Sequence, residues 1–362
     1  MKKRRLFSLF LSFALLLPLF SLTSADAYED FTLDAKAGLL IEADTGEILY
    51  EKNAHQENFP ASLTKVMVAL LVFEAIDEGK IALTDSVTAT ESAFEGLSSD
   101  GSTANIVPGE TMTVEQLLNC MLIVSANEAC NILGETLYGS VDAFVARMNE
   151  RAKELGMNDT HFVNCTGLDD GADAGEHLTT ARDIAIMSRE LIRHKEILTF
   201  SSTWMDTVRD GAFGLTNTNR LVRFYRGCNG LKTGSTAKAG FCVSATAERD
   251  GMTLICVIMG AANRDMRNAA AASLLDWGFA NYALYTCPAG NPTPVRVPGG
   301  IQPTVGVRHA AFSCVLPRAD LSSVEKDIEL PEAVPAPVKA GDTVGKLTFT
   351  CRGVSLGEVT IT

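Results

Sequence analysis

The stretch Pro60-Ala61-Ser62-Leu63-Thr64-Lys65 predicts the start of a helix that lies in the middle of a domain. Residues 66–73, which follow it, are apolar on every side, and a helix of this kind is buried. Proline is common at a helix start. Because Ser62 and Lys65 are three residues apart, they share one face of the helix. The hydroxyl of Ser62 would then lie at the positive end of the helix dipole beside a buried amine, an arrangement that can make a serine nucleophilic.

The spacing S-x-x-K is weak evidence on its own. The chain contains a second copy, Ser323-Val324-Glu325-Lys326, in an acidic stretch flanked by prolines and without an apolar helix after it. We interpret this second copy as chance. The first copy needs partner residues elsewhere in the chain.

Two further polar clusters can supply those partners. Ser125-Ala126-Asn127 interrupts the helical apolar spacing of residues 113–133, which predicts a turn between two helices. Lys232-Thr233-Gly234 lies in a predicted strand, and residues 240–246 and 254–259 predict a buried hairpin after it. The order S-x-x-K, S-x-N, K-T-G matches the motif set of β-lactamases and penicillin-binding proteins, whose middle motif is S-D-N.

The rest of the first 287 residues alternates strand and helix signals. Two β-type runs flank Asp44-Thr45-Gly46 and predict a hairpin over residues 38–50. Helical spacing recurs over residues 144–155 and 179–198. Residues 267–283 predict a last helix that packs on the sheet.

Composition gives the limits of size and partners. With 362 residues, 46% hydrophobic and 21% charged, the chain can bury a substantial core in one large domain or two. The formal net charge of −13 argues against nucleic acid as a partner. Because the composition shifts at the proline-rich residues 288–294, we expect a first domain over residues 28–287. A linker and a small β-rich domain would then occupy residues 288–362.

Residues 1–27 have the pattern of a signal peptide. Residues 2–5 are basic, residues 6–22 are apolar, and Ala25-Asp26-Ala27 is a small-x-small cleavage site. We therefore expect export to the cell envelope or secretion, with a mature chain that begins at Tyr28. An uncleaved N-terminal anchor is the alternative.

The cysteines and histidines form no recognisable site. Nine cysteines are scattered without a C-x-x-C pair, several of them in apolar runs. We expect most of them to be buried, and we predict neither a metal site nor a disulfide pairing. The five histidines lie in no catalytic motif, and each is better explained as a surface or loop residue.

Over residues 36–285 the sequence resembles the low-molecular-mass penicillin-binding proteins, which are serine-type D-alanyl-D-alanine carboxypeptidases. Besides the three motifs, the likeness includes residues 44–50, 53–54, 128–129, 162–164, 166–168, 180–183, 230–231 and 239–240. Ser235 follows the K-T-G motif where some relatives have histidine. Many members lie on the membrane through an amphipathic C-terminal helix, which we do not find before Thr362. We therefore expect membrane contact only through an uncleaved N-terminus or the C-terminal domain.

The resemblance implies an α/β fold of the β-lactamase/transpeptidase type. This fold has a central antiparallel sheet with helices on both faces and a helical subdomain that would bear Ser125, followed here by the small C-terminal β-domain. The implied activity removes the terminal D-alanine from peptidoglycan stem peptides ending in D-Ala-D-Ala, through an acyl-enzyme on Ser62. β-Lactam antibiotics are the implied inhibitors, and no cofactor is implied.

The chemistry of this family assigns a role to each motif residue. Ser62 is the expected nucleophile, Lys65 the base if its amine is neutral, and Ser125 the group that passes the proton towards the leaving amine. Backbone N–H groups of Ser62 and Ser235 form the expected oxyanion hole. The expected substrate-binding residues are Asn127, Lys232, Thr233, Gly234, Ser235 and Arg267. Among them, Lys232 and Thr233 would hold the substrate's carboxylate, and Asn127 would orient Lys65 or the substrate.

Each assignment has a purely structural alternative. Ser62 would then be only a helix cap, and Ser125 and Asn127 only turn residues. Lys232 would protect a sheet edge, and Arg267 would be a charge on a helix surface.

Two other functions stay open at this point. A serine β-lactamase shares the architecture, but the deacylating glutamate of class A enzymes lies in an E-x-x-L-N stretch after the S-x-N motif. Here Glu115-Gln116-Leu117-Leu118-Asn119 precedes Ser125 within an apolar helical run, and we interpret it as packing. A cell-wall peptide-binding protein without turnover would suit the β-rich tail, but it would not need the full set of catalytic residues.

Overall fold

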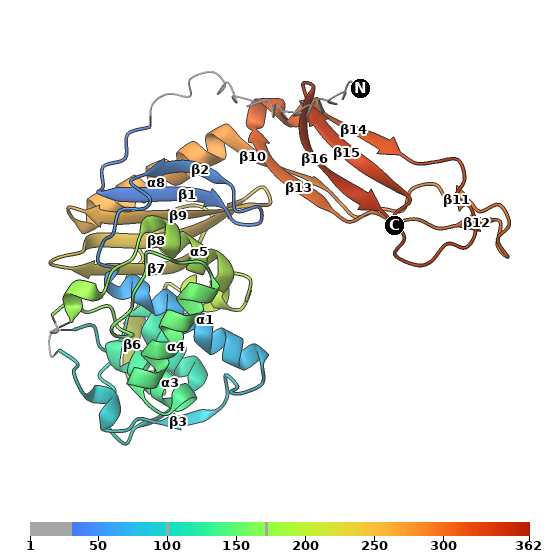
Figure 1. The fold of residues 1–362 in the computed structure, drawn as a ribbon. Coiled ribbons are helices and arrows are strands. Elements are labelled where there is room, and N and C mark those ends of the chain that lie inside the picture. The colour runs from blue at the N-terminus through green and yellow to red at the C-terminus, as the bar shows by residue number, and fades with distance from the viewer. Residues whose placement is uncertain (1–30, 99–100, 171–172) are drawn as a thin grey trace, which may run out of the picture. The chain divides into compact units, whose positions relative to one another are not determined.

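A five-stranded antiparallel sheet forms the centre of the fold (Figure 1). The computed structural model describes residues 31–98, 101–170 and 173–362, so the predicted signal peptide lies outside the described residues. The strands are β1 (Ala37–Glu42), β2 (Ile48–Lys52), β7 (Cys228–Thr236), β8 (Gly240–Arg249) and β9 (Met252–Ala261), in the spatial order β2-β1-β9-β8-β7. The predicted hairpins that turn at residues 44–46 and 250–251 are confirmed.

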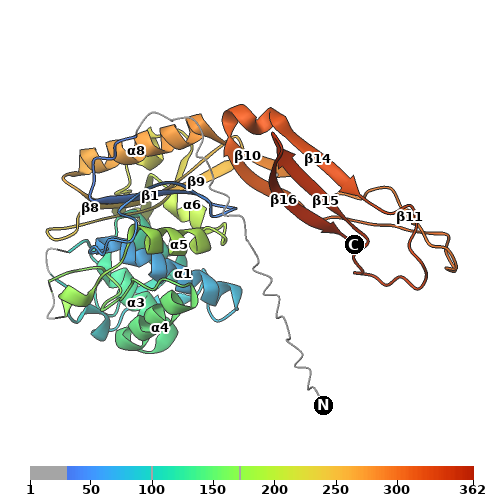
Figure 2. The ribbon, with the colours of Figure 1, turned by 45° about the horizontal axis from the view of Figure 1, so that its top comes forward.

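Helices cover both faces of this sheet, as predicted (Figure 2). On one face, α8 (Arg264–Asn281) packs on β8 and β9, and on the other, α5 (Ala181–Leu191) packs on β1 and β9. The helix predicted over residues 179–198 is interrupted, and α6 (Ile197–Ser201) begins after the break. The interruption follows from residues 193–196, four consecutive polar residues that cannot continue the buried apolar face.

Three helices form a helical subdomain. They are α2 (Val114–Ile123), α3 (Asn127–Tyr138) and α4 (Val141–Glu154). The predicted turn between α2 and α3 is confirmed, and Asn127 is the first residue of α3. Shorter elements connect these parts. They are β3 (Ser86–Thr88), β4 (Thr111–Thr113), β5 (Met205–Val208), β6 (Phe213–Thr216) and α7 (Leu221–Phe224), with the 3-10 turns η1 (Ala61–Thr64), η2 (Ser92–Phe94) and η3 (Ala174–Glu176).

The helix predicted after Ser62 is α1 (Lys65–Asp77), which begins directly after η1. Every residue from Lys65 to Phe73 is buried, as the apolar sequence predicts. The helix packs against α5 on the side of the sheet and against α2, α3 and α4 on the other side. It therefore lies between the sheet layer and the helical subdomain (Figure 1).

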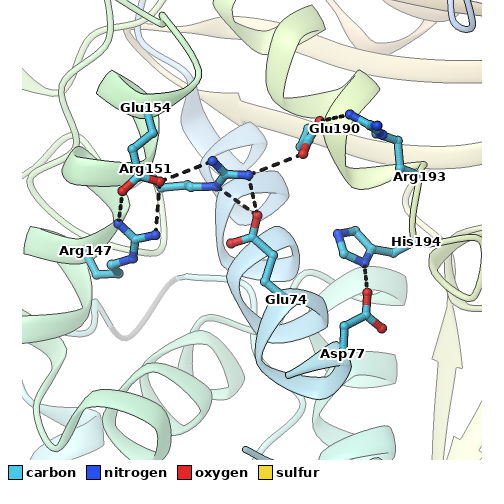
Figure 3. A network of polar contacts seen from close by, with 8 residues as sticks. All are labelled: Glu74, Asp77, Arg147, Arg151, Glu154, Glu190, Arg193 and His194. Carbon is cyan, nitrogen blue, oxygen red and sulfur yellow. Dashed lines mark hydrogen bonds and ion pairs between the residues drawn. The ribbon is translucent and has the colours of Figure 1, made fainter. Parts of the chain in front are cut away.

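Ion pairs fix the end of α1 that is remote from Lys65 (Figure 3). Arg151 of α4 places its Nη2 atom 2.6 Å from Oε1 of Glu74 and 3.3 Å from Oε1 of Glu190 in α5. Nδ1 of His194 lies 2.7 Å from Oδ2 of Asp77. Because Arg151, Glu74 and Glu190 are partly buried, this network is less screened than surface pairs and holds α1 against both neighbouring helices.

The C-terminal part is β-rich, as predicted. Its strands are β10 (Tyr282–Cys287), β11 (Val295–Arg296), β12 (Thr304–Val305), β13 (Phe312–Pro317), β14 (Val324–Glu329), β15 (Gly345–Cys351) and β16 (Val354–Ile361). It has its own cluster of buried residues, in which the rings of Phe312 and Phe349 stack 4.1 Å apart. Ser323 ends the 3-10 turn η4 (Arg318–Ser323), whereas Lys326 lies in β14, so the second S-x-x-K copy does not share a helix face. Across the described ranges, no helix combines the length and apolarity that a membrane span requires.

Candidate active site

The three sequence motifs meet at one cavity of about 380 Å³. It is lined by Ser62, Ser102, Ser125, Trp204, Thr216, Asn217, Thr218, Arg220, Thr233, Gly234, Ser235, Arg264 and Arg267. The loop around η1, the turn between α2 and α3, and the edge strand β7 each contribute one motif. A larger hollow of about 620 Å³ lies between the β1–β2 hairpin and α5, but no serine, cysteine or histidine lines it.

Lys65 is completely buried, and its amine lies within hydrogen-bond distance of four oxygen atoms. From Nζ these are Oδ1 of Asn127 (2.7 Å), Oγ of Ser62 (3.0 Å), the carbonyl oxygen of Thr166 (3.1 Å) and Oγ of Ser125 (3.3 Å). The amide and carbonyl oxygens can only accept hydrogen bonds. They therefore take two N–H groups of a neutral amine and leave its lone pair for the hydroxyl groups.

The surroundings of Lys65 favour that neutral amine. Burial lowers the pKa of Lys65, although Cys130, Cys165 and Glu128 act in the opposite direction. Burial and the charge of Lys65 hold the pKa of Lys232 well below its usual range. Two amines in one dry region disfavour each other's protonation, so Lys65 and Lys232 do not both carry a full positive charge.

The backbone around Ser62 is tightly constrained. Ala61 (φ 48°) and Ser125 (φ 68°) have left-handed conformations that cost energy for residues with a Cβ atom. A Cβ atom built on Gly234 would lie 2.8 Å from the backbone nitrogen of Ser62, and one on Gly167 would overlap the carbonyl of Ala61. Only glycine allows these two approaches.

The residues of β7 divide between the cavity and the interior. Thr233 and Ser235 line the cavity, and Oγ1 of Thr233 donates to Oγ1 of Thr218 over 2.8 Å. Lys232 is buried and is not among the lining residues; its Nζ donates to the carbonyl of Thr233 over 2.9 Å. The alternative in which Lys232 protects a sheet edge is wrong, because the side chain does not face solvent.

Arg267 is 3% exposed and lines the cavity, so the alternative of a helix-surface charge is wrong. Its Nε and Nη2 atoms donate to Oδ1 of Asn268 over 3.1 and 2.9 Å. Burial lowers the pKa of Arg267 to about 10, which still leaves it protonated at neutral pH. A buried cation that borders a cavity is suited to an anionic group of a ligand.

The other structural alternatives fail as well. Pro60 is the N-cap of η1 and Thr64 is the N-cap of α1, so Ser62 is not a helix cap. Asn127 binds Lys65 and Ser125 lines the cavity, so neither is only a turn residue.

The sequence analysis missed seven residues that line the cavity, namely Ser102, Trp204, Thr216, Asn217, Thr218, Arg220 and Arg264. It also missed two groups that position the site. The carbonyl of Thr166 binds Lys65, and a backbone acceptor has no sequence signal. Oε1 of Glu128 accepts hydrogen bonds from Oγ1 of Thr103 and from the N–H of Ala104, both over 2.7 Å, and so holds the loop that brings Ser102 to the cavity. A signal did exist here, since Glu128 directly follows the S-x-N motif.

The prediction that most cysteines are buried is confirmed. All nine are free thiols, and all but Cys314 are buried.

Known protein families and sequences match most of the chain. The profile of the D-alanyl-D-alanine carboxypeptidase family matches residues 23–263, and that of the penicillin-binding protein 5 C-terminal domain matches residues 304–362. D-alanyl-D-alanine carboxypeptidase DacF of Bacillus subtilis is 38% identical over 332 residues, which cover 90% of this chain and 84% of that protein. DacC of Escherichia coli is 33% identical over 343 residues, which cover 90% and 82%.

Solved structures agree in fold. Penicillin binding protein 5 from Haemophilus influenzae superimposes with a TM-score of 0.80 and 29% identity, over 93% of this chain and 98% of that one. Penicillin-binding protein D2 from Listeria monocytogenes, in its ampicillin-bound form, superimposes with a TM-score of 0.62 and 35% identity. That match covers 69% of this chain and 100% of the other. The predicted fold class is confirmed.

Proposed function

The chain belongs to the D-alanyl-D-alanine carboxypeptidase family, and from this membership we propose the roles of its individual residues. The predicted activity is confirmed: the protein is a serine-type D-Ala-D-Ala carboxypeptidase of the penicillin-binding protein class, which acts on peptidoglycan peptides and binds β-lactams. We assign the acyl-enzyme to Ser62. The observation that carries this assignment is the buried amine of Lys65, 3.0 Å from Oγ of Ser62, with acceptor-only oxygens on its other side.

In the proposed reaction, Oγ of Ser62 attacks the carbonyl of the penultimate D-alanine while its proton passes to Nζ of Lys65. The C–N bond then breaks, and the terminal D-alanine leaves with that proton. Ser125 lies 3.3 Å from the amine and lines the cavity, so its hydroxyl can carry the proton to the leaving nitrogen. Water then gives a proton to Lys65 and hydrolyses the ester, which restores Ser62 and releases the shortened peptide.

Substrate binding is assigned to the other side of the cavity. Thr233 and Arg267 would hold the carboxylate of the terminal D-alanine, and the backbone N–H groups of Ser62 and Ser235 would stabilise the oxyanion. Gly234 allows the close approach of β7 to the nucleophile. Asn127 orients the amine of Lys65.

When Lys65 is neutral, its charge no longer lowers the pKa of Lys232, and Lys232 would then contribute positive charge from beneath the cavity. Its amine donates to the carbonyl of Thr233, next to the proposed carboxylate position, and its burial removes it from direct lining of the cavity. A positive charge there would favour both the anionic substrate and the neutral form of Lys65.

The two alternative functions lack supporting observations. Glu115, the glutamate of the E-x-x-L-N stretch, is exposed on α2 and is not among the residues that line the cavity, so it offers no base for rapid deacylation. A binding protein without turnover would not explain a buried lysine beside the serine.

We further propose the division of the chain into a signal peptide (1–27), a peptidase domain (28–287), and a linker with a small β-domain (288–362). The separate cluster of buried residues in the C-terminal part supports the last boundary, although β10 already pairs with β13 across it. The signal-peptide pattern supports a location outside the cytoplasm, where peptidoglycan lies. Membrane contact would then occur through an uncleaved N-terminus or the C-terminal domain.

Intact mass after mixing with benzylpenicillin tests the assignment of Ser62. A persistent single adduct is expected on the wild type and on Ser323→Ala, which removes the serine of the second S-x-x-K copy. No adduct is expected on Ser62→Ala, which should also lose D-alanine release from a stem-peptide mimic. An adduct on Ser62→Ala would overturn the assignment, and an adduct that clears within seconds while penicillin is consumed would indicate a β-lactamase.

A further inference from the structure

We infer that His177, which no catalytic motif contains, is a positioning residue that joins the two segments holding Ser62 and Lys65. The inference rests on the proposed roles of these two residues. His177 follows η3 in a loop, yet only 1% of its surface is exposed. A buried imidazole needs partners for both ring nitrogens, and the identity of these partners shows what the residue connects.

Both ring nitrogens are bound, and their partners determine the tautomer. The backbone N–H of Val163 donates to Nδ1 over 3.3 Å, so Nδ1 carries no proton. Nε2 lies 2.9 Å from Oγ1 of Thr64. Because this hydroxyl donates its own hydrogen to the carbonyl of Ala61 over 2.9 Å, it must accept from Nε2. His177 is therefore a neutral imidazole with its proton on Nε2.

The hydrogen bonds that begin at Nε2 lead to the segment of the nucleophile. Thr64 is in η1, and the carbonyl that it binds belongs to Ala61, the residue directly before Ser62. Ala61 has a left-handed backbone (φ 48°), which an alanine keeps only where the surroundings hold it. The hydrogen bonds from His177 through Thr64 to Ala61 stabilise this backbone conformation.

The hydrogen bonds that begin at Nδ1 lead to the loop that binds the base. Val163 begins a loop in which Oδ1 of Asn164 accepts hydrogen bonds from the N–H groups of Thr166 (3.1 Å) and Gly167 (2.7 Å). The carbonyl of Thr166 in this loop accepts from Nζ of Lys65 over 3.1 Å. Anchoring Val163 therefore limits the movement of one of the oxygens that orient the amine.

The two segments that His177 binds also approach each other directly, because a Cβ atom built on Gly167 would overlap the carbonyl of Ala61. His177 thus closes a ring of contacts around the start of the nucleophile segment. Burial, helped by the charge of His161, lowers the pKa of His177 to about 4, so the ring stays neutral over the range in which the other groups act. The imidazole serves as a fixed connector and transfers no proton in the reaction.

The test is the rate of acylation by benzylpenicillin in the full chain, measured with a thermal unfolding curve for each variant. His177→Asn keeps an acceptor near the Nδ1 position and loses the donor to Thr64. Thr64→Val has nearly the same shape as threonine and removes this hydrogen bond together with the one to the carbonyl of Ala61. We expect each to slow acylation about 10- to 100-fold, because small displacements of reacting groups have effects of this size.

Three comparisons separate positioning from a general loss of structure. Thr64→Ser retains the hydroxyl and should restore a near wild-type rate. The double variant His177→Asn/Thr64→Val should be no slower than the slower single variant, because both remove one shared interaction. The control His161→Asn changes an exposed histidine two residues before Val163 and should acylate at the wild-type rate.

Single variants that acylate within about twofold of wild type, or effects that multiply in the double variant, would overturn the inference. A role confined to stability would lower the unfolding temperature and leave the acylation rate of the folded protein unchanged, which would also overturn it. Failure of the assignment of Ser62 has a different signature, since an adduct would then persist on Ser62→Ala.

Discussion

Nζ of Lys65 lies 2.7 Å from Oδ1 of Asn127, and both side chains are buried. The amide oxygen accepts one N–H of the amine without adding charge. A carboxylate at this position would stabilise the protonated amine, and a nearby opposite charge raises a pKa by about 1–3 units. We therefore expect Asn127→Asp to slow acylation by benzylpenicillin at neutral pH by about 10-fold or more, with recovery as the pH rises.

The measurement is the acylation rate constant as a function of pH. Asn127→Ala serves as the control, since it removes the amide without adding charge; it should lower the rate without moving the profile to higher pH. If the profile of Asn127→Asp coincided with that of the wild type, Lys65 would not be the base.

Gly234 gives a steric prediction. A Cβ atom there would lie 2.8 Å from the backbone nitrogen of Ser62, closer than real Cβ contacts, so Gly234→Ala must push β7 away from the nucleophile. A displacement of this kind is expected to slow acylation about 100-fold. Gly214→Ala is a matched control in another strand, because its Cβ would meet nothing within 4 Å. Equal rates in the two variants would show that the close approach of β7 has no role.

Arg267 gives a prediction about the substrate's carboxylate. Removing a charged hydrogen-bond donor costs about 1.5–3 kcal/mol, or roughly 10- to 100-fold in kcat/KM. We expect Arg267→Gln to show this loss with a peptide that ends in a free carboxylate and a much smaller loss with its C-terminal amide. D-alanine or D-alaninamide release measures both. Equal losses with the two peptides would place the carboxylate elsewhere.

Much of this fold could be predicted from sequence because its signals are local. The apolar run after Ser62 required a buried helix, and the turn residues at 44–46 and 250–251 placed two hairpins of the central sheet correctly. The motif spacing also brought Ser62, Ser125 and Thr233 to one cavity. These features depend on periodicity, turn chemistry and residue type, which a single sequence records.

The features that the sequence did not predict depend on contacts between distant segments. The sequence predicted Lys232 as a substrate-binding residue, but it did not predict that this side chain is buried and absent from the lining of the cavity. The buried state of His177 depends on Thr64 and Val163, which no local pattern connects to it. The carbonyl of Thr166 is a backbone group, and its position follows only from the folded loop.

The buried imidazole of His177 predicts sensitivity of the fold to acid. Its pKa is about 4 in the folded protein against an ordinary value of 6.5. Between these values the unfolded chain binds a proton at this residue and the folded protein does not, so the free energy of unfolding falls as the pH decreases from 6.5 towards 4. The difference in pKa corresponds to a loss of about 3 kcal/mol over the whole interval.

Chemical denaturation of the wild type and of His177→Asn at pH values near 7 and near 4.5 measures this contribution. The variant starts less stable at neutral pH, because it lacks the bond to Thr64, but it has no imidazole to protonate and should lose less stability on acidification. Asp183 acts in the opposite sense, since burial raises its pKa, but it is present in both proteins and cancels in the comparison. An equal decrease in the two proteins would mean that His177 takes up its proton in the folded state, which the contact with the N–H of Val163 opposes.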